Sequence, residues 1–149
     1  MTLTLSTTGK NLFAYLINGD QSTYGPALYA PGGGNNGAWG QAGTGTATDS
    51  DLQSPYGSKV KCSAVTVNTS EHSIRCDYTI SATSTVALTE FALYNYNGST
   101  YRYVAYDNRG AINLISGESV NVQMKFTFAS LKCEAKYVVR RLGGWVEYV

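Results

Sequence analysis

Apolar and polar residues alternate strictly from Val120 to Phe128, with a polar residue at every odd position. A period of two sends successive side chains to opposite faces of a strand, so this row predicts a half-buried antiparallel strand. The segment from Ile74 to Ile80 alternates in the same way. We expect the even-numbered apolar side chains of both rows to close a common hydrophobic interior between two sheets.

Short segments of this kind fill most of the chain, and turn residues separate them. Asn97-Gly98 predicts a hairpin turn into the next strand, and Asp107–Gly110 predicts a break. The pattern predicts an all-β fold, an antiparallel β-sandwich or jelly roll of about 7–9 strands in a single domain over residues 1–149. The expected strands cover residues 26–30, 58–67, 72–81, 86–95, 101–106, 120–128, 135–139 and 145–149.

Two N-terminal segments depart from this pattern. Residues 6–19 predict one short helix, because Ser6 offers an N-cap oxygen and Asn18-Gly19 suits a helix C-terminus. Residues 31–46 are so rich in glycine that they predict a surface loop without regular structure. Trp39 lies within this loop, where it could anchor the chain in a neighbour's pocket or fold back onto its own domain.

Few residues carry charge: 14% of the 149, against about 25% in ordinary soluble domains. The formal net charge is +1, which gives no basic surface for nucleic acid. No apolar run reaches the roughly 18 residues of a membrane span, so we expect no membrane partner. The segment Met1–Ser6 lacks the basic and apolar regions of a signal peptide, which predicts a chain made in the cytoplasm.

No residue set predicts catalysis, a metal or a cofactor, so we expect no enzyme. His72 is the sole histidine and lies in an expected turn, and one histidine defines no catalytic triad. Zinc needs more closely spaced ligands than Cys62, Cys76, Cys133 and this histidine supply. Cys62 and Cys76 could form a disulfide across a hairpin or be two small buried hydrophobes. Capping or turn stabilisation explains Asp49-Ser-Asp51 better than calcium binding does.

Tyrosines cluster around the expected hairpin at Asn97-Gly98. Alternation places Tyr101 and Tyr103 on one side of the strand and Tyr106 on the other. Such rings could form a platform for a sugar, and cross-strand pairing within the sheet explains them equally well. The cluster consists of Tyr94, Tyr96, Tyr101, Tyr103 and Tyr106.

Three motifs follow each other in a recognisable order. They are the segment GTGTATDSDL at Gly43–Leu52, LTEFALY at Leu88–Tyr94, and SGESVNVQMKFTF at Ser116–Phe128. This order resembles a group of small tailed-bacteriophage virion proteins of jelly-roll type. The resemblance covers about the first 128 residues. Residues 129–149 therefore predict a C-terminal extension used in assembly, and we expect the domain to fold without residues 135–149.

The resemblance implies a non-enzymatic structural protein of the virion. The expected role is a capsid decoration (cement) protein on the outer capsid surface, which binds the major capsid protein as a homotrimer. A tail or fibre-associated protein that contacts host glycans is the alternative. The residues expected at interfaces are Trp39, Tyr96, Tyr101, Tyr103, Trp145 and Tyr148.

Overall fold

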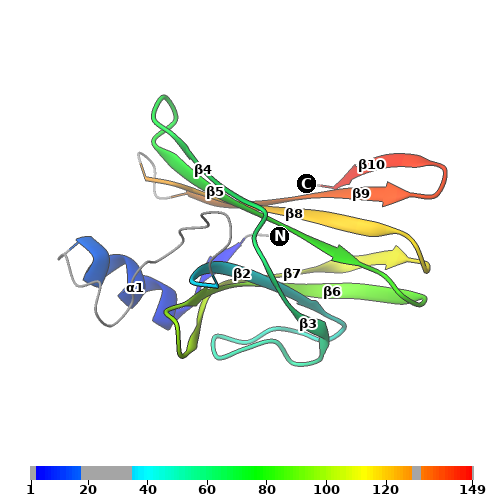
Figure 1. Cartoon of the computed structure of the whole chain (residues 1–149), viewed down its shortest axis with the longest axis horizontal. Coiled ribbons are helices and arrows are strands. Elements are labelled where there is room, and N and C mark those ends of the chain that lie inside the picture. The colour runs from blue at the N-terminus through cyan, green and yellow to red at the C-terminus, as the bar shows by residue number, and fades with distance from the viewer. Residues whose placement is uncertain (1–2, 18–34, 129–131, 149) are drawn as a thin grey trace.

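The computed structural model describes residues 3–17, 35–128 and 132–148, and it shows two five-stranded antiparallel sheets packed face to face (Figure 1). The helix α1 (Thr7–Ile17) lies at one end of the sandwich. Sheet A has the order β1 (Thr4–Leu5), β7 (Tyr101–Leu114), β6 (Val86–Tyr96), β2 (Gly37–Gly43) and β3 (Pro55–Lys61). Sheet B has the order β10 (Gly144–Tyr148), β9 (Lys132–Arg141), β8 (Ser119–Thr127), β5 (Ser73–Ser81) and β4 (Ala64–Asn68).

This architecture confirms the expected all-β sandwich with a short N-terminal helix. The described residues hold ten strands rather than seven to nine. One reason is that the expected strand at 58–67 is two strands. β3 ends at Lys61 in sheet A, the buried Cys62 lies at the crossing, and β4 begins at Ala64 in sheet B. The expected strand at 26–30 lies outside the described residues.

The two alternating rows line the interior side by side. β5 and β8 are neighbours in sheet B, with Cys76 opposite Met124 and Tyr78 opposite Val122. The common interior is therefore confirmed, but both rows belong to one sheet, because the intervening β6 and β7 cross to sheet A. Sheet A supplies the facing side chains, which include Leu88, Phe91, Leu93, Val104, Ile112 and Leu114. Phe128 follows the end of β8 and is half-exposed.

Two side chains accept hydrogen bonds from the backbone N–H groups in the first turn of the helix. The Ser6 Oγ accepts a hydrogen bond from the Gly9 N–H at 2.9 Å, which confirms the expected N-cap. The carboxylate of Asp49 accepts another from the Thr7 N–H at 3.1 Å. Leu12 is fully buried in the core, and the expected helix end at Asn18-Gly19 lies outside the described residues.

The expected structureless loop at 31–46 is wrong for its second half, because Gly37–Gly43 forms β2. This strand is paired on both sides, with β6 and with β3. Its glycines allow close approach rather than flexibility. A Cβ atom at Gly40 would overlap the ring of Tyr78 from the opposite sheet, and one at Gly43 would overlap the carboxylate of Glu90.

The expected break at Asp107–Gly110 is also wrong, because β7 continues through it. Asp107 is buried, and its Oδ2 accepts a hydrogen bond of 2.6 Å from the Tyr137 hydroxyl on sheet B. Burial raises the pKa of the Asp107 carboxyl, and this hydrogen bond partly offsets the rise. Asp107 therefore has a partner in the opposite sheet, and the segment continues the strand.

The C-terminal segment is part of the sandwich and not an extension of it. β9 pairs with β8 from Lys132 to Arg140, and it places Tyr137 and Val139 in the core. The Tyr137 ring packs on Phe91 of sheet A with a centroid distance of 4.6 Å. Removal of residues 135–149 would take Tyr137 and Val139 out of the core, so we now expect the truncated domain to be strongly destabilised, contrary to the expectation from the sequence that it folds without them.

We expect Gly40→Ala to destabilise the fold by about 1–3 kcal/mol, because the new methyl group forces the buried Tyr78 ring to move. Gly110→Ala on β7 is the matched control: a Cβ there meets nothing within 4 Å. This control should change the free energy of unfolding by less than about 0.5 kcal/mol. Urea denaturation followed by circular dichroism measures both variants, and equal stability of the two would contradict the close packing of β2.

Candidate functional site

Residues 44–54 form a loop, here called the clasp loop, that is held by a buried carboxylate. Glu90 on β6 is fully buried. Its Oε1 accepts hydrogen bonds from the N–H groups of Ser54 at 2.7 Å and Gly45 at 3.2 Å, and its Oε2 accepts one from Gln53 at 2.9 Å. The neighbouring Thr89 donates its hydroxyl to the Gly45 carbonyl at 2.7 Å. Both ends of the loop are therefore joined to β6.

Further polar contacts fix the middle of the clasp loop. The Asn108 side chain accepts from the Ala47 N–H at 2.7 Å and donates to the Ala47 carbonyl at 3.0 Å. Asp51 accepts the Tyr94 hydroxyl at 2.5 Å. Asp49 caps the helix, so the expected capping role of the Asp49-Ser-Asp51 segment is confirmed. Two of the three sequence motifs thus bind each other directly.

The clasp loop covers part of the outer face of sheet A and builds a second, smaller core there. Leu52 and Ala47 of the loop pack with the buried side chains of Tyr94 and Tyr103. We call the ring cluster on this side of sheet A the aromatic face. It consists of Trp39, Tyr94, Tyr96, Tyr101, Tyr103 and Tyr106.

A β-bulge brings Tyr106 to this face, contrary to the expected alternation. Tyr94 pairs with Tyr103 and the preceding residue of β6 pairs with Ala105, so Val104 is an extra residue in β7. Val104 and Ala105 both lie in the main core. Tyr106 therefore shares the outer face with Tyr103, and their rings stack at 5.7 Å with an interplanar angle of 12°.

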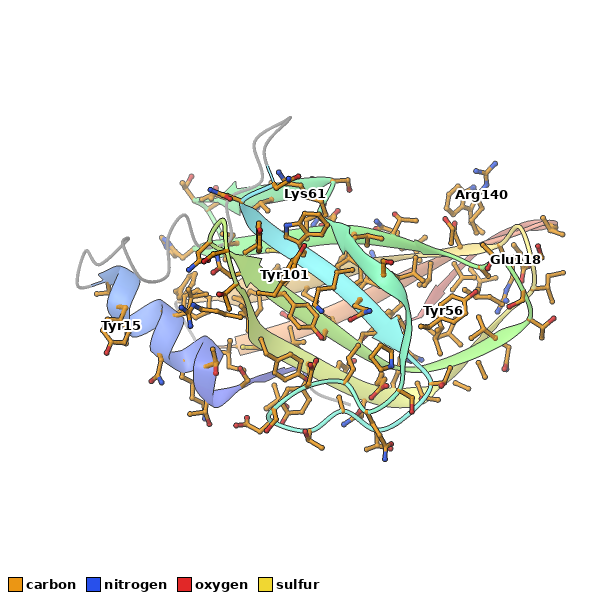
Figure 2. All side chains as sticks on the ribbon, turned by 60° about the horizontal axis from the view of Figure 1, so that its bottom comes forward. Tyr15, Tyr56, Lys61, Tyr101, Glu118 and Arg140 are labelled. Atoms are coloured by element: carbon orange, nitrogen blue, oxygen red, sulfur yellow. The ribbon has the colours of Figure 1, made fainter. Side chains whose placement is uncertain are left out.

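The accessible part of the aromatic face is a group of three rings in mutual contact. Figure 2 looks onto this side of the molecule, with Tyr101 near its centre. Tyr101 is 39% exposed, and its ring lies 4.5 Å from Tyr96 and 5.5 Å from Trp39 between centroids. The Trp39 Nε1 donates to the Asn35 carbonyl at 2.7 Å. The Lys59 ammonium lies over Tyr94 at 4.6 Å and over Tyr101 at 5.1 Å.

A pocket of about 290 Å³ opens beside these rings. Burial raises the pKa of Tyr94 and Tyr103, and the nearby Asp51 carboxylate raises both further. These phenols therefore stay protonated at neutral pH. The pocket offers hydroxyl groups, ring edges and the Lys59 ammonium, which suits non-covalent binding. Its lining is Thr8, Ser50, Asp51, Lys59, Tyr94, Tyr101, Arg102 and Tyr103.

The structure brings together only part of the expected interface set. Trp39, Tyr96 and Tyr101 lie side by side, whereas Tyr103 is buried below the clasp loop. Trp145 lies on β10 of the other sheet, and Tyr148 ends the same strand, with a side chain outside the described ones. Sequence reasoning missed Lys59, because its ring partners Tyr94 and Tyr101 belong to other strands, distant in the sequence, and no local signal marks the contact.

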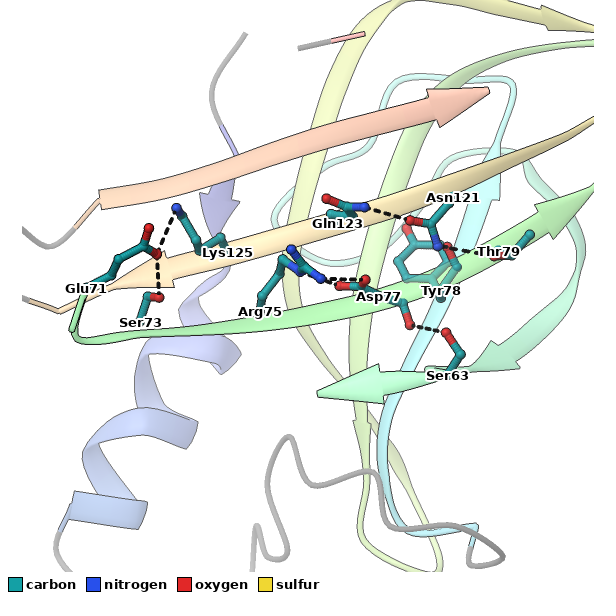
Figure 3. A network of polar contacts seen from close by, with 10 residues as sticks. All are labelled: Ser63, Glu71, Ser73, Arg75, Asp77, Tyr78, Thr79, Asn121, Gln123 and Lys125. Atoms are coloured by element: carbon teal, nitrogen blue, oxygen red, sulfur yellow. Dashed lines mark hydrogen bonds and ion pairs between the residues drawn. The ribbon is translucent and has the colours of Figure 1, made fainter. Parts of the chain in front are cut away.

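The outer face of sheet B is polar, and its charged groups bind one another (Figure 3). The Arg75 guanidinium makes two hydrogen bonds to the Asp77 carboxylate, at 2.8 and 3.1 Å. The Lys125 ammonium lies 3.3 Å from the Glu71 carboxylate and, with the Ser73 hydroxyl, lowers the pKa of Glu71. A groove of about 320 Å³ crosses this face. Because these pairs satisfy each other, we place the candidate site on the aromatic face instead.

The cysteines and the histidine that the sequence offered as candidates for catalysis or metal binding do not come together in a site. Cys62 and Cys76 are buried free thiols, which matches the interpretation as small hydrophobes, and burial raises the pKa of Cys62 to about 12. Cys133 is free as well. His72 is exposed in the β4–β5 turn at φ 56°. Within residues 3–17, 35–128 and 132–148, no three potential metal ligands come together.

Comparison with known proteins gives no relative: no family model, no curated protein and no solved structure matches the chain. Among the described residues, no helix is both long and apolar enough to cross a membrane. The candidate site is therefore defined by its geometry, which is a rigid group of rings beside a pocket and a loop that a buried carboxylate holds.

We expect Glu90→Gln to lower the free energy of unfolding by about 1.5–3 kcal/mol, because its carboxylate accepts backbone N–H groups that nothing else in the loop can satisfy. Glu134→Gln is the control, since the Glu134 side chain is 44% exposed and lies 3.7 Å from Lys132 in a surface ion pair. Thermal and urea unfolding measure both variants. A Glu90→Gln protein as stable as the control would contradict the role given to this carboxylate.

Proposed function

We propose that this chain is a non-enzymatic structural protein of a tailed-bacteriophage virion, where it decorates the outer capsid surface as a homo-oligomer. The aromatic face is the surface that binds the major capsid protein. The observation that carries this proposal is the group of Trp39, Tyr96 and Tyr101, in which Tyr101 is 39% exposed, the other two are partly buried, and the rings contact one another. The motifs that resemble those of phage virion proteins, Gly43–Leu52 and Leu88–Tyr94, build the support below this group.

Rigidity is what makes these rings suitable for a protein partner. Tryptophan and tyrosine dominate the binding energy of many interfaces, provided that they enter a well-packed contact. Ordering a side chain on binding costs about 0.5–1.5 kcal/mol, and this cost falls when the ring is already fixed. Trp39 is fixed by its hydrogen bond to Asn35, and the clasp loop holds Tyr94 from the other side.

A tail-associated protein that binds host glycans is the second candidate, and the same rings would serve it. A sugar stacks on an open ring face. In this structure Tyr96 lies against Tyr101 at an interplanar angle of 31°, and the Lys59 ammonium lies over Tyr101 and Tyr94. Because these ring faces already have partners, the geometry favours a protein contact over sugar stacking.

The test is binding of the purified chain to capsids of the phage that encodes it, prepared without this protein and measured by co-sedimentation. We expect the wild-type chain to bind and Tyr101→Ala to bind about tenfold more weakly or worse, as for a central aromatic contact. Tyr15→Ala is the matched control, because Tyr15 is an exposed tyrosine on α1, away from the rings.

Three results would contradict the capsid role. The wild-type chain could fail to bind capsids, or Tyr101→Ala could bind as well as Tyr15→Ala. A glycan array that retains the wild-type chain and loses Tyr101→Ala would instead establish the second candidate. Circular dichroism of each variant confirms that the fold is intact before binding is compared.

A further inference from the structure

The four edge strands of the sandwich are not equally protected against pairing with another chain. An edge strand presents unpaired N–H and C=O groups, and proteins protect such edges with short strands, lysine or proline. In sheet A, β1 has only two residues, and β3 carries Pro55, Lys59 and Lys61. Sheet B ends in β4 and β10, and neither strand contains lysine or proline.

β10 is the more apolar of these two open edges. Trp145 is 68% exposed and Val146 is 42% exposed, and Leu142 in the turn before them is 70% exposed. β4 exposes Val67 alone among its large hydrophobic residues. Within the part of the chain that the structure describes, no strand pairs with the outer edge of β10.

The register of the β9–β10 hairpin shows which backbone groups of β10 are open. Arg141 pairs with Gly144 across two turn residues, so this closing pair must exchange hydrogen bonds directly. Alternation then turns the backbone groups of Val146 toward β9 and those of Trp145 and Glu147 toward the free edge. Open donors and acceptors therefore stand on either side of Val146.

We propose that β10 pairs antiparallel with β10 of a second copy of this chain, across a two-fold axis at Val146. In this register Trp145 of one copy lies opposite Glu147 of the other, and each of these two pairs can exchange both hydrogen bonds. The two Trp145 residues take diagonal positions on one face, within reach of aromatic side chains. The open groups of one β10 are thus complementary to those of another.

A cation–ring contact orients the Trp145 side chain that the arrangement uses. The Arg140 guanidinium lies over the Trp145 ring at 5.8 Å, on the outer face of sheet B. The register places residue 147 of the second copy opposite Trp145, on the same face of the paired strands as this contact.

The pairing gives a closed dimer, because a two-fold contact uses the same surface on both copies. A five-residue edge buries less than the roughly 1,600 Å² of a standard interface, so we expect a dimer that dissociates on dilution. The inference rests on the homo-oligomer of the proposed function and makes it a two-fold dimer, in place of the homotrimer expected from the sequence. Its test in solution needs no capsid, so failure of either proposal can be recognised separately.

The experiment is sedimentation velocity of the full chain over a range of concentrations. The wild-type protein should approach twice its 16.0 kDa mass as concentration rises. Trp145→Lys should weaken self-association about tenfold or more, since lysine protects a natural edge strand and the exposed ring is lost. Val67→Lys is the matched control, because Val67 is 67% exposed on the other open edge, and it should leave the dimer unchanged.

Glu147→Pro tests the backbone contact itself. Proline removes an N–H group that points to the free edge, so the variant should fold, as circular dichroism can show, and remain monomeric. A monomeric wild-type chain, a trimer, or a dimer that Trp145→Lys and Glu147→Pro leave intact would overturn the proposal. Loss of self-association in Val67→Lys would also overturn it, because β4 would then take part.

Discussion

The carboxylate of Glu90 is the contact on which the outer architecture depends. It is fully buried, and it accepts backbone N–H groups from both ends of the clasp loop. A buried carboxylate without such partners would be strongly unfavourable, so the loop and the glutamate require each other. The loop in turn caps α1 through Asp49 and holds Tyr94 through Asp51. One side chain thus links the sheet, the helix and the aromatic face.

Two buried tyrosines and one glycine determine how closely the two sheets pack. The Tyr78 ring of sheet B occupies the space that Gly40 of sheet A leaves free, and its hydroxyl lies 3.4 Å from the Gln41 carbonyl. Tyr137 crosses the interior in the same direction to reach Asp107. Large side chains from one sheet meet small or polar positions of the other, which is how a close-packed interior accepts rings of this size.

Sequence periodicity predicted the strands that have one face in the core and the other toward solvent. β5 and β8 alternate cleanly, and the Asn97-Gly98 turn was found because its chemistry is local. The strand β2 could not be predicted, since its glycines Gly40 and Gly43 make room for Tyr78 and Glu90, two residues distant in the sequence. The bulge at Val104 leaves no mark in the alternation, so Tyr106 was assigned to the wrong face. The candidate site was therefore predicted as a group of rings, without Lys59 or the supporting loop.

Hydrogen exchange measured by NMR tests the central role of Glu90 most directly. The account predicts that the N–H groups of Gln53 and Ser54 exchange as slowly as those of the core strands, because their acceptor is buried. The N–H groups of Ser70 and Glu71, which bind the exposed Asn68 side chain, serve as the internal reference for a turn open to solvent. If the N–H groups of Gln53 and Ser54 exchange as fast as those of Ser70 and Glu71, the central role of Glu90 is contradicted.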